Sequence, residues 1–92
     1  MAAAEEIVLE EWVIRLDGNV VELLHETGVG YRYHVAHVAV EAKPTDDGMT
    51  LRVGIDSGGT IVEGAKVPVP LERQGEVESM FTEARRRRDG LA

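Results

Sequence analysis

The hydrophobic pattern of this chain changes its period once, near residue 70, and that change limits the fold more than any other feature. Before this point, apolar residues recur mainly at every second position over short runs, as in strands that bury one face. After it, Val77, Met80, Phe81 and Ala84 recur at the spacing of one helix face. The sequence therefore predicts an α+β fold in which strands come first and one amphipathic helix caps them.

The strongest local prediction is a β-hairpin near the N-terminus. Trp12, Ile14 and Leu16 fall on alternate positions, and Asp17-Gly18-Asn19 supplies a tight turn. Residues 20–25 then resume an extended pattern that is rich in Val and Leu. We expect the two runs to pair as antiparallel strands.

The middle of the chain predicts further strands that are separated by turns. Residues 31–42 are rich in β-formers, but Val35 and Val38 lie three positions apart, which indicates a bulge or a single turn. A second hairpin is expected around the polar loop 43–48, with a strand over residues 49–55. After a turn at residues 56–59, a short strand leads to Lys66-Val67-Pro68-Val69-Pro70, which the prolines restrict to an edge strand or an extended connection.

Together these runs predict a strongly bent antiparallel sheet, or a partly open barrel, of about five to seven short strands over about residues 7–70. The capping helix is expected over about residues 72–88, with acids toward its start and arginines at its end, as suits the helix dipole. Glu83 and Arg87 have the i,i+4 spacing of an ion pair. We expect a single domain over residues 1–92, with residues 1–5 disordered.

Composition restricts the compartment and the partners. The chain has no cysteine, which excludes disulfides, thiolate nucleophiles and zinc sites with cysteine ligands. The N-terminus lacks the pattern of a signal peptide, and no apolar run is long enough to span a bilayer, so we expect a cytoplasmic protein. The formal net charge is -7, and a phosphate-binding protein normally shows a basic face. Nucleic acid and membrane are therefore not the expected partners.

The histidines His34 and His37 are one candidate interaction site, because histidine can act as an acid, a base or a metal ligand near neutral pH. In an extended strand the two side chains point to opposite faces, so they can share a ligand only if the break between them turns them together. A zinc ion would need two more ligands, and the nearby glutamates lack a zinc-binding spacing. We therefore predict no metal site.

Four consecutive arginines, Arg85, Arg86, Arg87 and Arg88, are the other candidate interaction site. They could contact phosphate or an acidic partner. However, four consecutive residues span more than one helical turn, so they fan around the helix and form no single basic stripe. The simpler interpretation is that they complement the helix dipole.

No motif in the chain predicts catalysis. Asp56-Ser57-Gly58-Gly59-Thr60 contains glycines that could approach a phosphate, but it lacks the lysine and the following helix of a phosphate-binding loop. Paired acids such as Asp46 and Asp47 lie in loops, where carboxylates are usually solvated. We predict no catalytic residue and no cofactor, and we lean towards a protein that is not an enzyme.

Four segments carry a resemblance to a known fold. Residues 12–24 resemble an opening hairpin with an Asp-Gly turn, and Val35-Ala36-His37-Val38-Ala39-Val40 resembles the end of a third strand. Gly48-Met49-Thr50-Leu51-Arg52-Val53 resembles a glycine-led fourth strand, and Val77, Met80 and Phe81 match a closing helix. In this order of elements the chain resembles the pleckstrin-homology-like (PH-like) superfold, in particular its compact bacterial members.

The resemblance implies a non-enzymatic binding or assembly module. We expect it to contact a protein or peptide partner, or a second copy of itself, through an exposed strand edge or the groove between sheet and helix. A full PH fold has seven strands, whereas the pattern here supports five or six. Basic residues that bind phosphoinositides are not carried over, since the first hairpin offers Arg15 among acids. The alternative hypothesis is a small ligand-binding or metal-binding protein, or an enzyme, that uses His34 or His37 with a nearby carboxylate.

Overall fold

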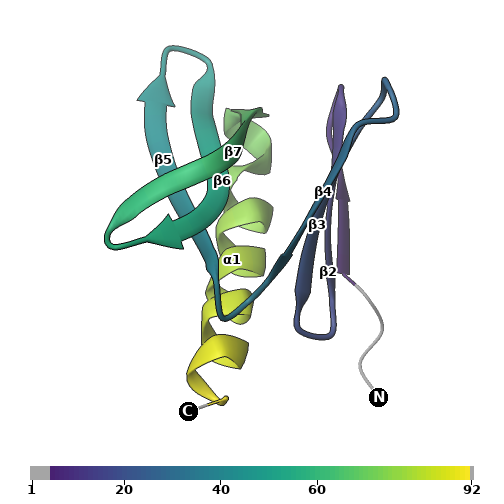
Figure 1. Cartoon of the computed structure of the whole chain (residues 1–92). Helices are drawn as coiled ribbons and strands as arrows, with labels where there is room; N and C mark the ends of the chain where they lie inside the picture. Colours follow the sequence, from purple (N-terminus) through teal and green to yellow (C-terminus); the bar gives the residue numbers. More distant parts are fainter. Residues whose placement is uncertain (1–4, 92) are drawn as a thin grey trace.

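The structure, a computed structural model, describes residues 5–91 and divides the strands into two antiparallel sheets (Figure 1). The first sheet has the order β1-β2-β3-β4, and the second has the order β5-β6-β7. The strands are β1 (Glu5–Val8), β2 (Trp12–Asp17), β3 (Val20–His25), β4 (Gly30–His34), β5 (Val38–Thr45), β6 (Gly48–Ser57) and β7 (Thr60–Pro70). A 3-10 turn, η1 (Leu71–Arg73), leads into the helix α1 (Gln74–Asp89).

The predicted α+β class, the antiparallel pairing and the C-terminal helix are confirmed, but the strands of the described residues form two sheets rather than one continuous bent sheet, and they close no barrel. The sheets separate at the break that was predicted near residue 35. Residues 35–37 form a turn, in which the His37 N–H donates to the His34 carbonyl at 2.9 Å. The Val35 N–H donates to the carbonyl of Asn19 at 2.8 Å, and the Val35 side chain is fully buried. This turn, anchored by the buried Val35 side chain, directs β5 away from the first sheet.

Strand β7 is longer than predicted. It pairs with β6 along its length, except at a bulge between the register pairs Val53–Ala65 and Ile55–Val62. The alternation on β7 resumes after the bulge, because Ala65, Val67 and Val69 are buried while the prolines are exposed. At the other end of the chain, β1 begins at Glu5, the last residue of the segment that was expected to be disordered, and residues 1–4 lie outside the described part.

The core lies between the apolar faces of the two sheets and one face of α1. Ile14, Leu16, Val21 and Leu23 from the first sheet are fully buried. The second sheet and the helix add apolar side chains that are also buried: Leu51, Val53, Val67, Val77, Met80, Phe81 and Ala84. The helical stripe predicted from the sequence is therefore the face that packs.

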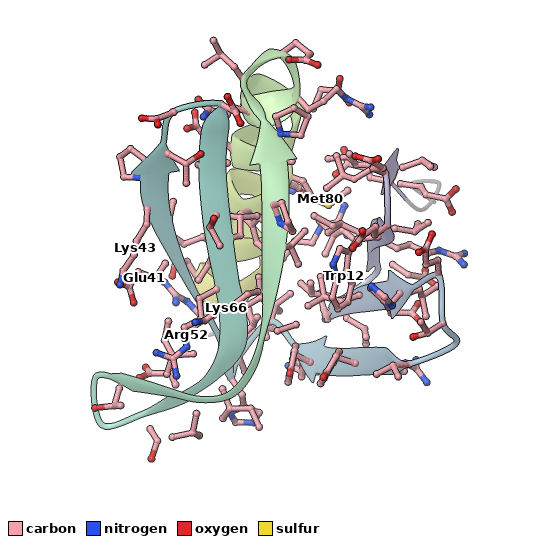
Figure 2. The ribbon with its side chains drawn as sticks, turned by 90° about the horizontal axis from the view of Figure 1, so that it is seen from above. Trp12, Glu41, Lys43, Arg52, Lys66 and Met80 are labelled. Atoms are coloured by element: carbon pink, nitrogen blue, oxygen red, sulfur yellow. The ribbon has the colours of Figure 1, made fainter. Side chains whose placement is uncertain are left out.

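The outer face of the second sheet is charged. Figure 2 shows Glu41, Lys43, Arg52 and Lys66 over this sheet, and all four residues are exposed. Their neighbours along the strands point to the opposite face, where the helix lies, because side chains alternate along a strand. The second sheet thus turns a polar face to solvent and an apolar face to α1.

Both ends of α1 are bound to the first sheet. At the start, the Arg73 Nη1 group donates to the carbonyl of Val8, at the end of β1, at 3.0 Å. At the other end, the Arg87 Nη1 group donates to the carbonyl of Gly18, in the turn between β2 and β3, at 2.5 Å. Figure 1 shows the helix running between the two sheets. These two contacts set the position of the helix relative to the first sheet.

We expect Gly48→Ala to destabilise the protein, because a methyl group at this position would collide with the carbonyl of Val69 and lie 2.8 Å from the backbone nitrogen of Leu71. The expected loss in the free energy of unfolding is about 1–3 kcal/mol, as for other overpacked sites, measured by chemical denaturation. The control is Gly75→Ala in α1, where the added methyl meets no atom within 4 Å. This change should stabilise by up to about 1 kcal/mol, and equal effects of the two substitutions would contradict the packing argument.

Candidate functional site

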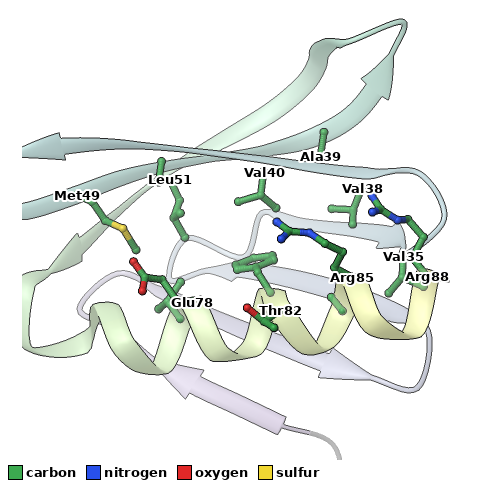
Figure 3. A pocket seen from close by; sticks show the side chains of 14 residues that line it. Val35, Val38, Ala39, Val40, Met49, Leu51, Glu78, Thr82, Arg85 and Arg88 are labelled. Atoms are coloured by element: carbon green, nitrogen blue, oxygen red, sulfur yellow. The ribbon is translucent and has the colours of Figure 1, made fainter. Parts of the chain in front are cut away.

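An open groove lies between strand β5 and helix α1 (Figure 3). Its volume is about 520 Å³. The strand side of the groove is apolar and is formed by residues of β5 and β6, including Val38, Val40, Ala42 and Leu51. Phe81 belongs to the helix side. The groove is therefore an extension of the core face that the helix leaves uncovered.

The groove exists because the helix is held on the side of the first sheet. Met80, Glu83 and Arg87 lie on the flank of α1 that turns towards that sheet, whereas Glu78 and Arg85 lie on the flank that lines the groove. As a result, Val38 and Val40 of β5 are only half-buried and Ala42 is exposed, although Met49, Leu51 and Val53 of β6 are buried. These uncovered side chains of β5 lie next to a free strand edge.

The backbone of β5 is unpaired along its outer edge, since no strand of the described residues lies beyond it. Thr45 and Gly48 close the two-residue turn of the β5–β6 hairpin, which makes them a hydrogen-bonded pair. At the other end, the Asp56 N–H donates to the carbonyl of His37 at 2.8 Å. Odd-numbered residues of β5 therefore bond to β6.

The even-numbered residues of β5 direct their main-chain groups outward. The N–H and C=O groups of Val38, Val40 and Ala42 accordingly face the open edge, while their side chains line the groove. Pro44 is also an even-numbered residue of β5, but it lacks an N–H group, so the series of outward donors ends at Ala42.

The opposite edge of the second sheet is blocked. Pro68 pairs with Thr50 and Pro70 pairs with Gly48. Because proline cannot donate to β6, both residues occupy pairs in which the nitrogen points to the outer edge. The edge of β7 thus lacks donors at these two positions, and prolines at sheet edges hinder pairing with a further strand. The second sheet has one blocked edge and one open edge.

The four-arginine segment is divided between two environments. Arg85 and Arg88 line the groove at the end near Val38, whereas Glu78 lines it at the end near Met49 (Figure 3). The groove therefore has one acidic end and one basic end, on either side of its apolar strand residues.

The other two arginines are bound to Glu83. Arg86 donates to both Glu83 carboxylate oxygens at 2.7 and 2.5 Å, and the Nε group of Arg87 donates at 2.9 Å. The predicted Glu83–Arg87 ion pair is thus confirmed. These hydrogen bonds, first from Arg86 and then from Arg87, lower the pKa of Glu83 from 4.5 to about 2.

The two candidate histidines lie at the turn between the sheets and do not line the groove. Both side chains are exposed, and their ring centroids are 6.1 Å apart. The Nδ1 atom of His34 accepts a hydrogen bond from the Ala36 N–H at 3.1 Å. Within residues 5–91, no group of three or more His, Asp or Glu side chains is placed to hold a metal ion. The geometry offers no support for a site built on His34 and His37.

The sequence analysis missed an aromatic cluster at the end of the first sheet. The rings of Trp12 and His25 meet edge to face with their centroids 4.6 Å apart, and Tyr31 lies 6.3 Å from Trp12. The Glu11 carboxylate lies 3.6 Å from the His25 Nε2 atom. The signal was present in the sequence, because Trp12 and His25 are opposite each other in the predicted hairpin. The cluster packs across β2, β3 and β4 at one end of the first sheet.

Comparisons with known proteins bring no functional information to this site. No protein-family model, curated protein or solved structure matches the chain. In the part of the chain that the structure describes, α1 is too short and too polar to cross a membrane.

The edge geometry predicts an alternating pattern of amide exchange along β5. In dilute solution, where β5 pairs only with β6, the amides of Val40 and Ala42 should exchange rapidly with deuterium. The amides of Glu41 and Lys43 should be protected by at least about tenfold, because they bond to β6. Residue-resolved exchange measured by NMR tests this prediction. Equal protection of all four amides would contradict the assignment of odd-numbered residues to β6 and of even-numbered residues to the open edge.

The depressed pKa of Glu83 predicts a pH-dependent effect of Glu83→Gln. Because the carboxyl is more acidic in the folded state, its contribution to stability is present above pH 4.5 and is lost as the pH falls towards 2. The variant should therefore unfold at a lower temperature than the wild type at pH 7, and the difference should shrink towards pH 2. The control Glu26→Gln removes the same charge from an exposed turn outside α1 and the groove, and should stay close to the wild type. If the unfolding temperatures of Glu83→Gln and the wild type differed by the same amount at every pH, the lowered pKa of Glu83 would be contradicted.

Proposed function

We propose that this chain is a cytoplasmic, non-catalytic PH-like module that binds an extended protein segment along the edge of β5. The observation that carries this proposal is the open β5 edge next to an apolar groove. The bound segment belongs to a peptide or protein partner, or to a second copy of the chain. The absence of cysteine suits a reducing compartment.

The order of elements supports the PH-like assignment. Four antiparallel strands are followed by three more and by one C-terminal helix that packs on them. The strands include β1, which the sequence pattern did not predict and which pairs with β2 from Glu5–Leu16 to Val8–Val13.

Strand addition explains why the edge and the groove occur together. An added strand gains affinity from main-chain hydrogen bonds and specificity from alternate side chains. Here the outward groups of Val38, Val40 and Ala42 supply the hydrogen bonds, and the groove receives the side chains of the added strand that point to the inner face. The other edge of the second sheet is less suited to strand addition, because β7 carries Pro68 and Pro70.

The edges of the first sheet are less suited to strand addition. Its outer strands, β1 and β4, have 4 and 5 residues, against 8 in β5. Short edge strands are a common protection against pairing with other chains. Of the sheet edges in the described residues, β5 therefore combines free donors, up to Pro44, with an adjoining groove whose strand side is apolar.

Ala42→Pro tests the proposal, because it removes one outward N–H group and leaves the bonds to β6 in place. Peptides selected from a displayed random library against the wild-type chain should bind this variant at least about tenfold more weakly in titrations. Lys66→Pro is the matched control, since it makes the same change on the outer edge of β7 and should leave binding unchanged.

Two results would overturn the proposal. One is a set of selected peptides that binds Ala42→Pro as tightly as the wild type, provided that the variant keeps the wild-type circular dichroism spectrum. The other is the combination of no selected peptide with no self-association and no protection of the Val38, Val40 and Ala42 amides at high protein concentration.

A further inference from the structure

We infer that the strand added to β5 is β5 of a second copy of this chain, so that the second sheets of two copies join across a two-fold axis at Val40. This inference rests on the proposed function, because it names the occupant of the same edge. The backbone, the ends of the ladder and the charges of the groove each support it.

The open edge of β5 is symmetric about Val40. In an antiparallel pair with its axis at this residue, Val40 faces Val40 of the second copy, and Val38 faces Ala42 of the second copy. All of these residues direct their N–H and C=O groups outward, so each pair can exchange two hydrogen bonds. The identical edge therefore satisfies its own donors and acceptors.

The hydrogen-bonded ladder between the two copies of β5 is limited by Pro44 at one end and by the turn before Val38 at the other. The next outward residue after Ala42 is Pro44, which has no N–H group. Its counterpart on the second copy would be Ala36, which lies in the turn between the two sheets. The pairing is thus limited to the segment from Val38 to Ala42 and cannot slip far in either direction.

The charges of the groove are complementary under the same two-fold axis. Figure 3 shows Val40 at the level of Thr82 on α1, with Glu78 on one side of this level and Arg85 on the other. The helix runs along β5, so the two copies of α1 are antiparallel across the joined grooves. Glu78 then lies at the level of Arg85 of the second copy, and Arg85 lies at the level of Glu78 of the second copy.

The arginines of α1 also differ in whether they are available to a second copy. Arg86 and Arg87 are bound to Glu83 within the chain, whereas the guanidinium of Arg85 faces the groove. On the outer face, Glu41 of each copy would lie opposite Ala39 of the other copy. Within each copy, Glu41 of β5 is already paired in register with Arg52 of β6.

A two-fold contact of this kind is isologous and closes at two copies, so it produces a dimer rather than a filament.

A charge-swap experiment on the full chain tests the inference. Sedimentation velocity over a concentration series should show a dimer for the wild type. Arg85→Glu alone, or Glu78→Arg alone, places like charges together at two symmetric positions and should raise the dimer dissociation constant by at least about tenfold. The double variant with both changes restores opposite charges and should recover dimerisation. Arg86→Glu is the control, because Arg86 lies outside the groove, and it should dimerise like the wild type.

Cross-linking tests the position of the two-fold axis. The chain has no cysteine, so Val40→Cys introduces a single thiol. Hydrogen-bonded antiparallel residues have Cα atoms about 5.5 Å apart, within reach of a short bifunctional thiol reagent. Val40→Cys should therefore cross-link to a covalent dimer, whereas Thr60→Cys, in the exposed β6–β7 turn, should not.

The outcomes separate this inference from the proposed function. A chain that stays monomeric at every concentration overturns the β5 dimer, and so does a dimer that is unaffected by the single charge reversals or that fails to cross-link through Val40→Cys. In either case, a selected peptide that binds the wild type and loses affinity for Ala42→Pro would leave the proposed strand addition intact.

Discussion

The attachment of helix α1 to the first sheet is the constraint on which the rest of the structure depends. Arg73 binds the carbonyl of Val8 at one end of the helix, and Arg87 binds the carbonyl of Gly18 at the other. Both contacts are charge-assisted hydrogen bonds to main-chain groups, which are stronger than neutral ones. Because the helix is held on this side, its apolar stripe closes the core while β5 stays partly uncovered. The groove follows from where the helix is attached.

The two edges of the second sheet differ in their main-chain donors. On β7, Pro68 and Pro70 remove donors from the outer edge, which prevents a further strand from pairing there. On β5, Pro44 limits the open segment only at its end. A sheet with two open edges could add strands without limit, whereas one blocked and one open edge allow a single addition. This asymmetry agrees with a defined binding or assembly event.

The arginines at the end of α1 show how neighbours decide what a charge can do. Glu83 holds Arg86 and Arg87 through short hydrogen bonds, and Arg87 also reaches the first sheet. Arg85, one position earlier, has no such partner among the described residues and borders the groove. The same residue type therefore stabilises the fold at one position and supplies recognition at the next. Histidines His34 and His37, which also looked like candidates, lie outside the groove.

The sequence by itself determined the features that depend on neighbours close in the chain: the first hairpin, the break before Val38, the helical stripe and the Glu83–Arg87 pair. Each of these is encoded by periodicity or spacing within a few residues. Only the tertiary structure decided that the strands form two sheets, that α1 lies against the first, and that a groove remains beside β5. The contacts responsible, such as Val35 to Asn19 and Arg87 to Gly18, join residues far apart in the chain. Local patterns carry no information about such pairings, because any exposed carbonyl could accept the same hydrogen bond.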